Sequence, residues 1–324
     1  MYPLQPNTQV AVLLCAHTGD DPVQPLSQTE YVRLVDWLKG KGYPLEIMLS
    51  PDVSLLLLEM ETHTEVSAGR VEALLGRGAQ LALWLERWSN AGMWIASWGD
   101  AEYPPLLRKK LYKHAPVLLH GFGNPELLKQ GGLAIVGSRR ASEALLEVTR
   151  CVANRCAREG WTVVSGGAKG VDRAAMLGAL EEGGTCVGVL AADLARIATS
   201  TSLRDYLLAD KLCLISPYHP QSGFTVGNAM GRNKVIYALA EFALVMACEE
   251  EQGGTWAGAV ENLRNGWTPL FVYVGENAPS DNNSLLAYNA YPFVPSEGEM
   301  LREQLHNRLR MAPVGQLALP IQAT

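Results

Sequence analysis

The segment LAIVGSRRAS, residues 133–142, joins a short apolar run to a loop that holds a glycine, a serine and two arginines. The segment VVSGGAKGVD, residues 163–172, repeats this order with a second glycine-rich loop. Similar apolar runs rich in Val, Ile or Leu follow at residues 185–190, 212–215, 242–247 and 270–274. Runs of this length and composition are typical of strands that are covered on both faces.

Helical stretches separate these runs, at residues 141–159, 171–182, 201–209, 228–240 and 255–265. Strands that alternate with helices are joined by right-handed crossovers, which produce a parallel sheet with helices on both faces. The sequence therefore predicts an α/β fold, with a doubly wound and mainly parallel sheet over residues 131–295.

Residues 1–95 differ from the rest of the chain in their sequence pattern, which predicts a small helical module. Ser27 and Glu30 have the spacing of a capping box at the start of an amphipathic helix. A second helix at residues 68–75 is followed by a glycine turn and a further helical stretch. Such a helix pair is either a nucleic-acid-contacting module or a packing unit. The length of 324 residues agrees with two domains of about 150 residues each.

The remaining segments predict less regular structure. Residues 96–130 are rich in Pro and Gly turns and predict a connector that carries Arg108, Lys109, Lys110 and Lys113. This basic cluster taken alone indicates a solvated face. Residues 296–324 predict a C-terminal helix followed by a loose tail.

Composition excludes several classes of protein. Hydrophobic residues make up 48% and charged residues 19%, which excludes a disordered chain. A net charge of -6 argues against a protein that coats nucleic acid through its global charge. However, residues 101–175 hold 12 Lys and Arg against 6 Asp and Glu, a local +6 that leaves -12 for the rest. This division favours a bounded anion-binding groove.

The sequence gives little support for a membrane-spanning helix, a signal peptide or a metal site. The longest apolar runs, residues 10–16 and 55–58, are far shorter than the roughly 20 residues of a spanning helix. No basic region precedes an apolar stretch at the N-terminus, so no signal peptide is expected. The six cysteines form no C-x-x-C pair. We therefore expect a cytoplasmic protein with reduced, buried thiols, no membrane contact, no metal and no cofactor.

Four predicted strands end in loops of unusual composition, and in a parallel sheet all four loops share one edge. Glycines allow the backbone to approach a ligand, helix N-termini offer free N–H groups, and Arg or Lys adds positive charge. Taken alone, Ser165-Gly166-Gly167 is more typical of a tight turn, and Arg139-Arg140 is more typical of a solvated helix start. Together, the four loops predict a pocket or groove for anions. The candidate phosphate-binding residues are Gly137, Ser138, Arg139, Arg140, Ser165, Gly166, Gly167, Lys169, Arg232, Asn233, Lys234, Gly254 and Thr255.

Dinucleotide binding fits these loops poorly. The loop from Gly137 lacks the second and third glycines of G-x-G-x-x-G, and Arg139 stands where the pyrophosphate needs close backbone approach. The second strand is followed by no acidic residue to hold a ribose. Lys169 has the wrong spacing for a P-loop.

The ordered motifs resemble the DprA/Smf family of DNA-processing proteins. AIVGSR at residues 134–139, VSGGAKGVD at 164–172 and GRNKVI at 231–236 correspond to successive family motifs. Further blocks correspond at residues 103–107 (YPPLL), 253–255 (GGT) and 283–290 (NSLLAYNA). The similarity runs in order from about residue 97 to 292, and the N-terminal helices are compatible with the family's variable module.

The resemblance implies a Rossmann-like domain that binds single-stranded DNA through its backbone. It also implies a homodimer that loads a RecA-type recombinase onto single strands during natural transformation. By motif, Gly137, Ser138 and Arg139 hold one phosphate, and Ser165, Gly166, Gly167 and Lys169 hold its neighbour. Arg232 and Lys234 then line the groove, and Gly254 and Thr255 close its far side.

This sequence departs from the family motifs at several positions. Gly167 replaces the usual Leu, and Lys169 and Lys234 replace Arg, which keeps the charge but loses bidentate geometry. Residues 216–230 lack the usual acidic and Phe-Pro elements. The tail after about residue 295 is too short for the winged-helix domain that some members carry.

Two functions remain open at this point. The first is a non-catalytic single-strand-binding protein, with Tyr218, Phe224 or Trp256 either stacking on bases or packed in the core. The second is a nucleotide sensor of the same fold, in phage defence for example, or a nucleotide-processing enzyme. The latter resembles the lysine-decarboxylase-like phosphoribohydrolases, whose P-G-G-x-G-T-x-x-E motif carries a catalytic glutamate. Here Gly258 stands at that position and Glu261 lies one turn further on.

Overall fold

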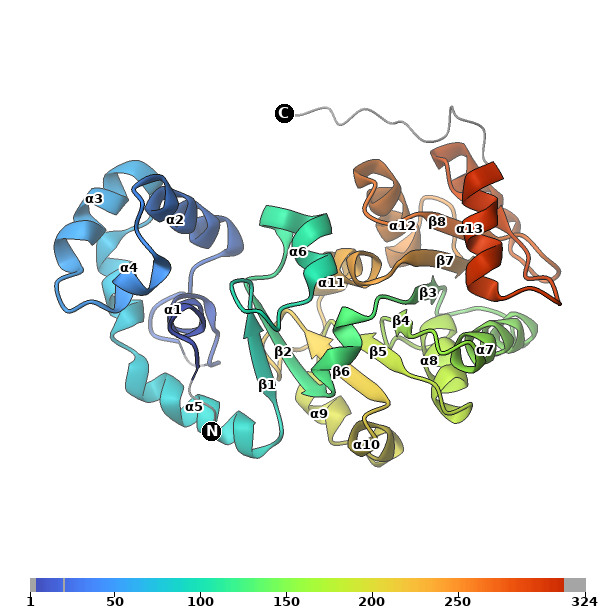
Figure 1. Ribbon diagram of the computed structural model, residues 1–324, viewed down its shortest axis with the longest axis horizontal. Coiled ribbons are helices and arrows are strands. Elements are labelled where there is room, and N and C mark those ends of the chain that lie inside the picture. Colours follow the sequence, from blue (N-terminus) through green and yellow to red (C-terminus); the bar gives the residue numbers. More distant parts are fainter. Residues whose placement is uncertain (1–3, 20, 312–324) are drawn as a thin grey trace.

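The helices N-terminal to the sheet are the first elements of the computed structural model, which describes residues 4–19 and 21–311 (Figure 1). They are α1 (Pro6–Cys15), α2 (Gln28–Gly40), α3 (Ser54–Thr64), α4 (Ala68–Leu75) and α5 (Gly78–Asn90). The predicted capping box is confirmed, because the Ser27 N–H donates to the Glu30 carboxylate at 2.7 Å while the Glu30 N–H donates to Ser27 Oγ at 3.3 Å. Each bond pairs a helix-end group that would otherwise lack a partner.

The described residues form one nine-stranded sheet in the order β1-β2-β6-β5-β4-β3-β7-β8-β9. Its strands are β1 (Trp94–Ser97), β2 (Leu118–Gly123), β3 (Leu133–Gly137), β4 (Val163–Ser165), β5 (Cys186–Val189), β6 (Leu212–Ser216), β7 (Phe242–Ala247), β8 (Leu270–Tyr273) and β9 (Tyr291–Phe293). In this spatial order, all neighbouring strands from β6 to β9 are parallel. At the other end of the sheet, β2 is antiparallel to both of its neighbours, β1 and β6. This confirms the predicted α/β fold with a mainly parallel sheet.

The six predicted strands are present, and three outer strands, β1, β2 and β9, are not predicted by the sequence. The segment expected as a turn-rich connector contains β2 and a helix, α6 (Pro105–Leu111). A histidine and glycines interrupt the apolar run of β2, and one of these, Gly121, is required because the Trp94 ring covers the place of its Cβ. The single exposed Pro292 breaks the β9 pattern.

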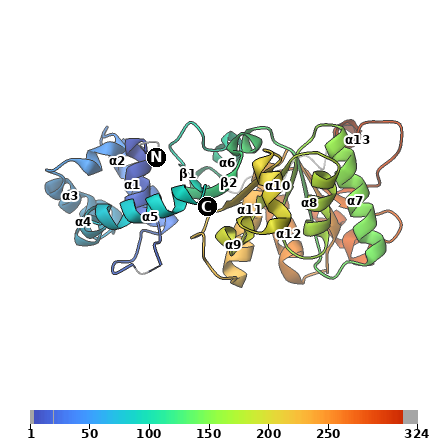
Figure 2. The ribbon, with the colours of Figure 1, turned by 90° about the horizontal axis from the view of Figure 1, so that it is seen from below.

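Helices cover both faces of the sheet (Figures 1 and 2). Along β3, Leu133 and Ile135 pack in one core with α7 (Glu143–Arg158), α8 (Val171–Glu181), α9 (Leu194–Ala198) and α10 (Thr201–Leu208). Ala134 and Val136 face the opposite core, which includes α6, α11 (Val226–Leu239) and α12 (Gly253–Asn265). This alternation follows from the two-residue period of a strand.

The chain changes direction across the sheet after β6. It runs outward from β3 through β4 and β5 to β6, and α11 then carries it back to β7 on the other side of β3. In sheets of this kind a crevice opens at the carboxyl ends of the two strands where the order reverses. The reversal between β3 and β7 is therefore the expected place for a ligand.

The last described helix, α13 (Leu301–Met311), packs into the core on the α7 face through the fully buried Leu301 and Leu305. The expected loose tail after it lies outside the described residues. No helix in the described ranges is long and apolar enough to cross a membrane. All six cysteines are free and four are buried, but Cys151 is exposed, contrary to expectation.

Candidate functional site

A cavity of about 380 Å³ lies at the reversal point between β3 and β7. Its lining comes from the segments after β3, β4 and β7, the segment before α11, one side of α11 as far as Tyr237, and the first turn of α12. Of the predicted residues, the structure brings together Gly137, Ser138, Arg139, Arg140, Arg232, Asn233, Gly254 and Thr255 in this lining. The four-loop prediction therefore converges on one cavity, although the second loop contributes only Ala168 and Asp172.

An ion pair of two buried residues forms the floor of this cavity. Asp172 Oδ2 lies 3.9 Å from Arg232 Nη1, and the residues are 6% and 5% exposed. The Asp172 carboxylate accepts the Gly137 N–H at 3.3 Å, while Arg232 Nη1 donates to the Val189 carbonyl at 3.1 Å. Burial raises the pKa of Asp172 above its ordinary value, and the Arg232 charge with the N–H groups of the first and second loops opposes this rise.

Arg232 therefore supports the cavity from below and is not a free phosphate ligand. Burial lowers its pKa, and the Asp172 charge counteracts this effect. Its Nε has no hydrogen-bond partner within the described part of the chain. The anion that the second loop holds is thus the protein's own carboxylate, located in the first turn of α8, where negative charge is favourable.

Glycines let the first two loops pass closely over this pair. A Cβ at Gly166 would overlap the Arg232 guanidinium. Gly170 has φ +78°, and a Cβ there would lie 2.8 Å from the Arg139 Cα of the first loop. Both positions require glycine because the neighbouring atoms leave no space for a side chain.

None of the four predicted residues of the second loop lines the cavity; Gly166 instead passes over the Arg232 guanidinium. Ser165 is fully buried, and its hydroxyl donates to the Ile135 carbonyl at 2.6 Å, which ties β4 to β3. Gly167 is an exposed turn residue with φ +68°. Lys169 is exposed and has no ion-pair partner among the described residues. Lys169 therefore extends the positive charge of the first loop outside the cavity.

Arg139 is an exposed cation of the lining that makes no ion pair with the described residues. Its guanidinium carbon lies 5.1 Å from the centroid of the Phe224 ring, within the range of a cation–π contact. Phe224 precedes α11 and is 55% exposed, which is unusual for a large aromatic side chain. The pair presents a positive charge and a flat ring side by side at the cavity mouth.

Arg140 is held by a carboxylate of the same lining. Its Nη2 donates to both oxygens of Glu249, at 3.0 and 2.8 Å, across the mouth of the cavity. Ser138 Oγ accepts the Arg140 N–H at 3.1 Å, and the Ser138 N–H donates to the Ala247 carbonyl at 2.9 Å. The ion pair and the backbone bond connect the loop after β3 to the end of β7.

The N-terminus of α12 forms the opposite wall. Gln252 at its N-cap makes no side-chain cap hydrogen bond, so the first turn, with Gly254 and Thr255, keeps its N–H groups for other acceptors. Asn233 Nδ2 donates to the Gly254 carbonyl at 2.9 Å and fixes α12 against α11. Gly258 allows this approach, because a Cβ there would lie 2.8 Å from Asn233 Nδ2.

Lys234 is separated from the other predicted residues. Its side chain lines a second cavity, on the side of α11 that faces β2 and the N-terminal helices. Of the three aromatic candidates, Phe224 lines the first cavity, Trp256 is buried in the core, and Tyr218 donates its hydroxyl to the Asn228 carbonyl at 3.0 Å.

Sequence reasoning missed Asp172 and Glu249 as partners of the two arginines. An acidic residue at the start of a helix, two positions after Gly170, is the available signal for Asp172. No local signal identifies Glu249, because its pairing with Arg140 depends on β3 and β7 being neighbours.

Comparisons with known proteins identify a family and relatives of this chain. The family model described as DNA recombination-mediator protein A matches residues 94–291. DNA processing protein DprA of Streptococcus pneumoniae (strain ATCC BAA-255 / R6) is 34% identical over 141 residues, 43% of this chain and 49% of the relative. DprA of Bacillus subtilis (strain 168) is 28% identical over 154 residues, 46% and 50% of the two chains. These alignments span about half the length of each relative.

Solved structures share the fold. The X-ray structure of Streptococcus pneumoniae DprA has a TM-score of 0.66 at 20% identity, covering 90% of this chain and 95% of that one. DNA processing protein A of Helicobacter pylori, described by its single-stranded DNA binding mode, has a TM-score of 0.54 at 22% identity, covering 68% and 98%. Since the family model covers more than half of the sequence and these structures share its architecture, the chain belongs to the DNA recombination-mediator protein A (DprA/Smf) family.

Proposed function

We propose that this chain is a non-catalytic, single-stranded-DNA-binding recombination mediator that holds backbone phosphates at the carboxyl edge of its sheet. The observation that carries the proposal is the pairing of charges in the cavity lining. Both carboxylates, Asp172 and Glu249, are matched by Arg232 and Arg140, which leaves Arg139 as the unmatched cation beside the α12 N-terminus.

One phosphate fits between Arg139 and the first turn of α12. The helix N-terminus supplies N–H donors and a favourable dipole, and Arg139 supplies charge-assisted hydrogen bonds. Lys169, exposed beside the first loop, is positioned for a neighbouring phosphate of the strand. Gly137, Ser138, Gly166 and Gly167 then act through loop shape, whereas Ser165 and Arg232 act as supports.

Phe224 supplies the contact to a base. An exposed ring at the mouth of a cationic cavity fits the stacking that single-strand binders use, which is sequence-tolerant because every base has a flat face. A duplex keeps its bases stacked on one another and cannot offer a free face. We therefore infer a preference for single strands.

Family membership supports two further parts of the proposal. The family model is named for recombination mediation, from which we infer a RecA-type recombinase as partner and a homodimer as the working form. Light scattering on the purified protein tests the dimer, and co-purification with a RecA-type recombinase on single-stranded DNA tests the partner.

The alternative is a nucleotide sensor, since a cavity of about 380 Å³ falls within the range of small-molecule sites. A phosphoribohydrolase activity is not proposed, because Gly258 occupies the position of the catalytic glutamate and packs against Asn233.

A fluorescence-anisotropy titration separates these functions. Labelled oligo-dT, the matching duplex and a panel of nucleotides are titrated at two salt concentrations. Single-strand binding that weakens with salt, and exceeds duplex binding, supports the proposal. Nucleotide binding without single-strand affinity would overturn it in favour of the sensor.

A further inference from the structure

A second cavity, of about 480 Å³, lies between the N-terminal helices and the sheet. Its walls come from the segment after α1, the start of α2, the beginning of β2, the loop after β6 and one side of α11. The titratable side chains in the lining are Cys15, His17, His120, Tyr218, His219 and Lys234, and no carboxylate is among them.

His120 is the first sign that this cavity takes a ligand. It is 3% exposed in β2, and neither ring nitrogen makes a hydrogen bond of good geometry within the described residues, although the backbone of Ser216 and Tyr218 lies near enough to raise the pKa of the ring. A buried imidazole whose ring nitrogens are poorly paired is costly, because each has lost its water. Burial, together with the nearby His219, lowers the pKa of His120 to about 4, so the ring is neutral and offers one donor and one acceptor.

Lys234 is the second sign. Burial lowers its pKa, and the Glu261 charge only partly opposes this effect. Across residues 4–19 and 21–311, its amine makes no ion pair or hydrogen bond. A half-buried cation in a lining without carboxylates favours an anion that enters from solvent.

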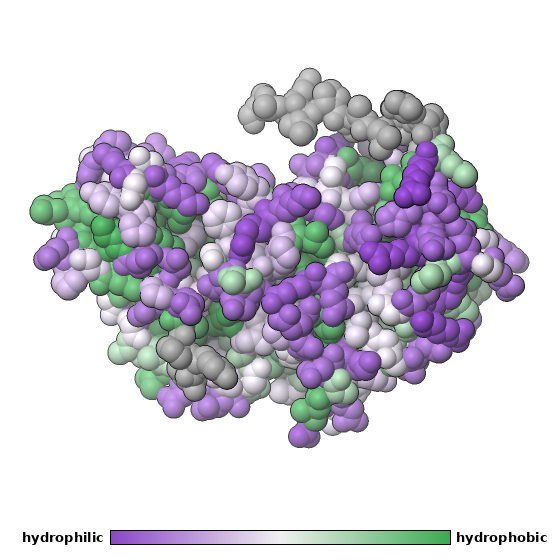
Figure 3. Space-filling model, viewed as in Figure 1, coloured by the Kyte–Doolittle hydropathy of each residue, from purple (hydrophilic) through white to green (hydrophobic). Residues whose placement is uncertain are grey.

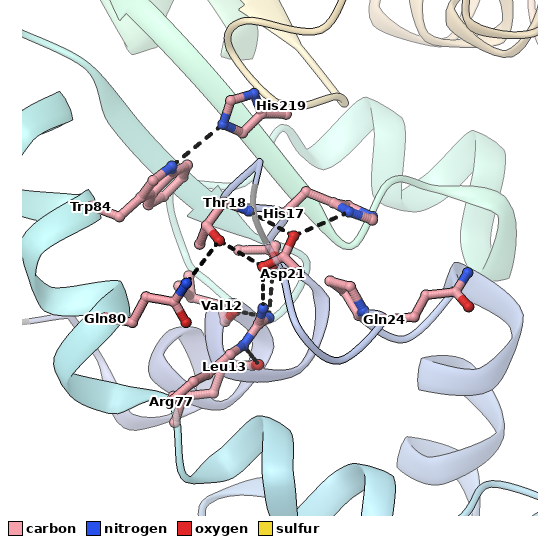
Figure 4. A network of polar contacts seen from close by, with 12 residues as sticks. Val12, Leu13, His17, Thr18, Asp21, Gln24, Arg77, Gln80, Trp84 and His219 are labelled. Carbon is pink, nitrogen blue, oxygen red and sulfur yellow. Dashed lines mark hydrogen bonds and ion pairs between the residues drawn. The ribbon is translucent and has the colours of Figure 1, made fainter.

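The wall formed by the N-terminal helices is held rigidly (Figure 4). The Arg77 side chain, 7% exposed, donates to Asp21 at 2.9 Å and to the Ala16 carbonyl at 2.7 Å. Asp21 accepts from the Thr18 hydroxyl at 2.6 Å and lies 3.7 Å from His17 Nδ1. This network fixes the short segment after α1 that places His17 at the cavity.

The opposite wall is fixed to the same helices. Trp84 Nε1 of α5 donates to His219 Nε2 at 3.4 Å, and Gln28 Nε2 donates to the Ala115 carbonyl at 2.9 Å. A pre-formed cavity of this kind loses little conformational entropy when a ligand binds.

We propose that this second cavity binds a small organic anion of about mononucleotide size, whose phosphate or carboxylate pairs with Lys234 and whose polar body lies against His120 and Tyr218. The volume is within the range of small-molecule sites. The site is distinct from the first cavity, since Arg232 and Asn233 line the first and Lys234, next in the same helix, lines the second.

Calorimetry and thermal unfolding test the proposal on the full chain. The probes are the nucleoside monophosphates, citrate as an organic carboxylate, and inorganic phosphate. We expect at least one organic probe to bind and to raise Tm with concentration, as any ligand of the native state does. Binding of a nucleoside monophosphate identifies a phosphate as the anionic group of the ligand, whereas binding of citrate identifies a carboxylate.

Lys234→Met removes the charge and keeps the length of the side chain, and we expect it to weaken binding at least tenfold. Lys211→Met, which removes an exposed and distant charge, and Arg139→Ala, which alters the first cavity, keep the wild-type affinity. Circular dichroism without probe checks that Lys234→Met is folded, and Lys234→Arg restores binding.

The proposal is overturned if no organic probe binds the wild-type protein. It is equally overturned if Arg139→Ala abolishes binding and Lys234→Met does not, because the probe then occupies the first cavity. Single-strand binding is measured on the same samples, so failure of the proposed DNA-binding function remains distinguishable from failure of this site.

Discussion

The Asp172 carboxylate lies 3.9 Å from the Arg232 guanidinium, beneath the two glycine-rich loops that face the first cavity. Both side chains are buried, and each charge is needed because it offsets the other. The pair joins α8 to α11 and gives the first loop an acceptor for the Gly137 N–H. The geometry of the cavity therefore rests on a buried charge pair at its floor.

Asp172→Asn should destabilise the protein strongly, by about 3–5 kcal/mol, because it leaves the Arg232 charge buried without a partner. The midpoint of urea unfolding should fall accordingly. Asp193→Asn is the matched control, since its Arg196 partner is exposed and the loss should stay below about 1 kcal/mol. If both variants lose the same free energy of unfolding, the buried Asp172–Arg232 pair does not support the cavity. Adding Arg232→Met to Asp172→Asn should recover part of the loss.

Arg139→Ala should weaken binding of oligo-dT about tenfold and reduce the salt dependence. Each phosphate contact that is lost should make the slope of log affinity against log salt less steep by about 0.7. Arg204→Ala, which removes an exposed arginine of α10 away from the cavity, serves as the control and should leave both quantities unchanged. An unchanged slope in Arg139→Ala would place the phosphates elsewhere.

Phe224→Ala should weaken single-strand binding by about 1–3 kcal/mol through lost stacking, with the salt slope unchanged. Phe224→Trp should retain affinity because it keeps a flat ring beside Arg139. Anisotropy titrations at two salt concentrations separate this effect from that of Arg139→Ala. A steep change in slope on removal of Phe224 would show that the ring only positions the arginine.

Glu249→Gln should strengthen DNA binding several-fold. The change releases Arg140 from its ion pair, in which Nη2 donates to both carboxylate oxygens, and removes a negative charge from the cavity mouth. The exposed pair itself is worth about 1 kcal/mol or less, so stability should change little. Glu251→Gln, which neutralises an exposed neighbour outside the lining, controls for net charge. Equal gains from both variants would argue for a general charge effect.

Glu30→Gln should lower Tm near pH 7 but not near pH 2. The hydrogen bond from Arg70, helped by the N–H and hydroxyl of Ser27, lowers the pKa of Glu30 to about 2. A depressed carboxyl pKa stabilises the fold above the ordinary value near 4.3, and this contribution is lost as pH falls toward 2. Gln at this position can still complete the capping box, so the difference in Tm reports the loss of the charge alone. A constant Tm difference from pH 7 to pH 2 would contradict this assignment.

The sequence predicts the central part of the fold because its signals are local. Apolar runs mark the six inner strands, and Ser27 with Glu30 marks the start of α2. The edge strands lack such signals: β2 contains His120 and Gly121, and the glycine is required by Trp94 of the neighbouring strand.

The loops that form the site can be predicted from the sequence, but the role of each residue in those loops is less predictable. Arg139 and Thr255 are identified by motif and lie in the lining. Arg232 and Ser165 are also identified by motif, but in the structure they are buried and bond to other parts of the protein. Their burial and their partners depend on strands that the fold brings together, which the local sequence does not show. Lys234 follows Asn233 directly, yet successive residues of a helix point about 100° apart and these two face different cavities.

The position of the first cavity also determines when it can form. Residues 137–140 lie early in the sheet and residues 248–255 lie late, so the cavity requires a contact of long sequence separation. A nascent chain that has not yet produced β7 and α12 has the arginines but no opposing wall. Single-strand binding in a ribosome-release or truncation series should therefore begin only after α12 is complete, which makes it a readout of finished folding.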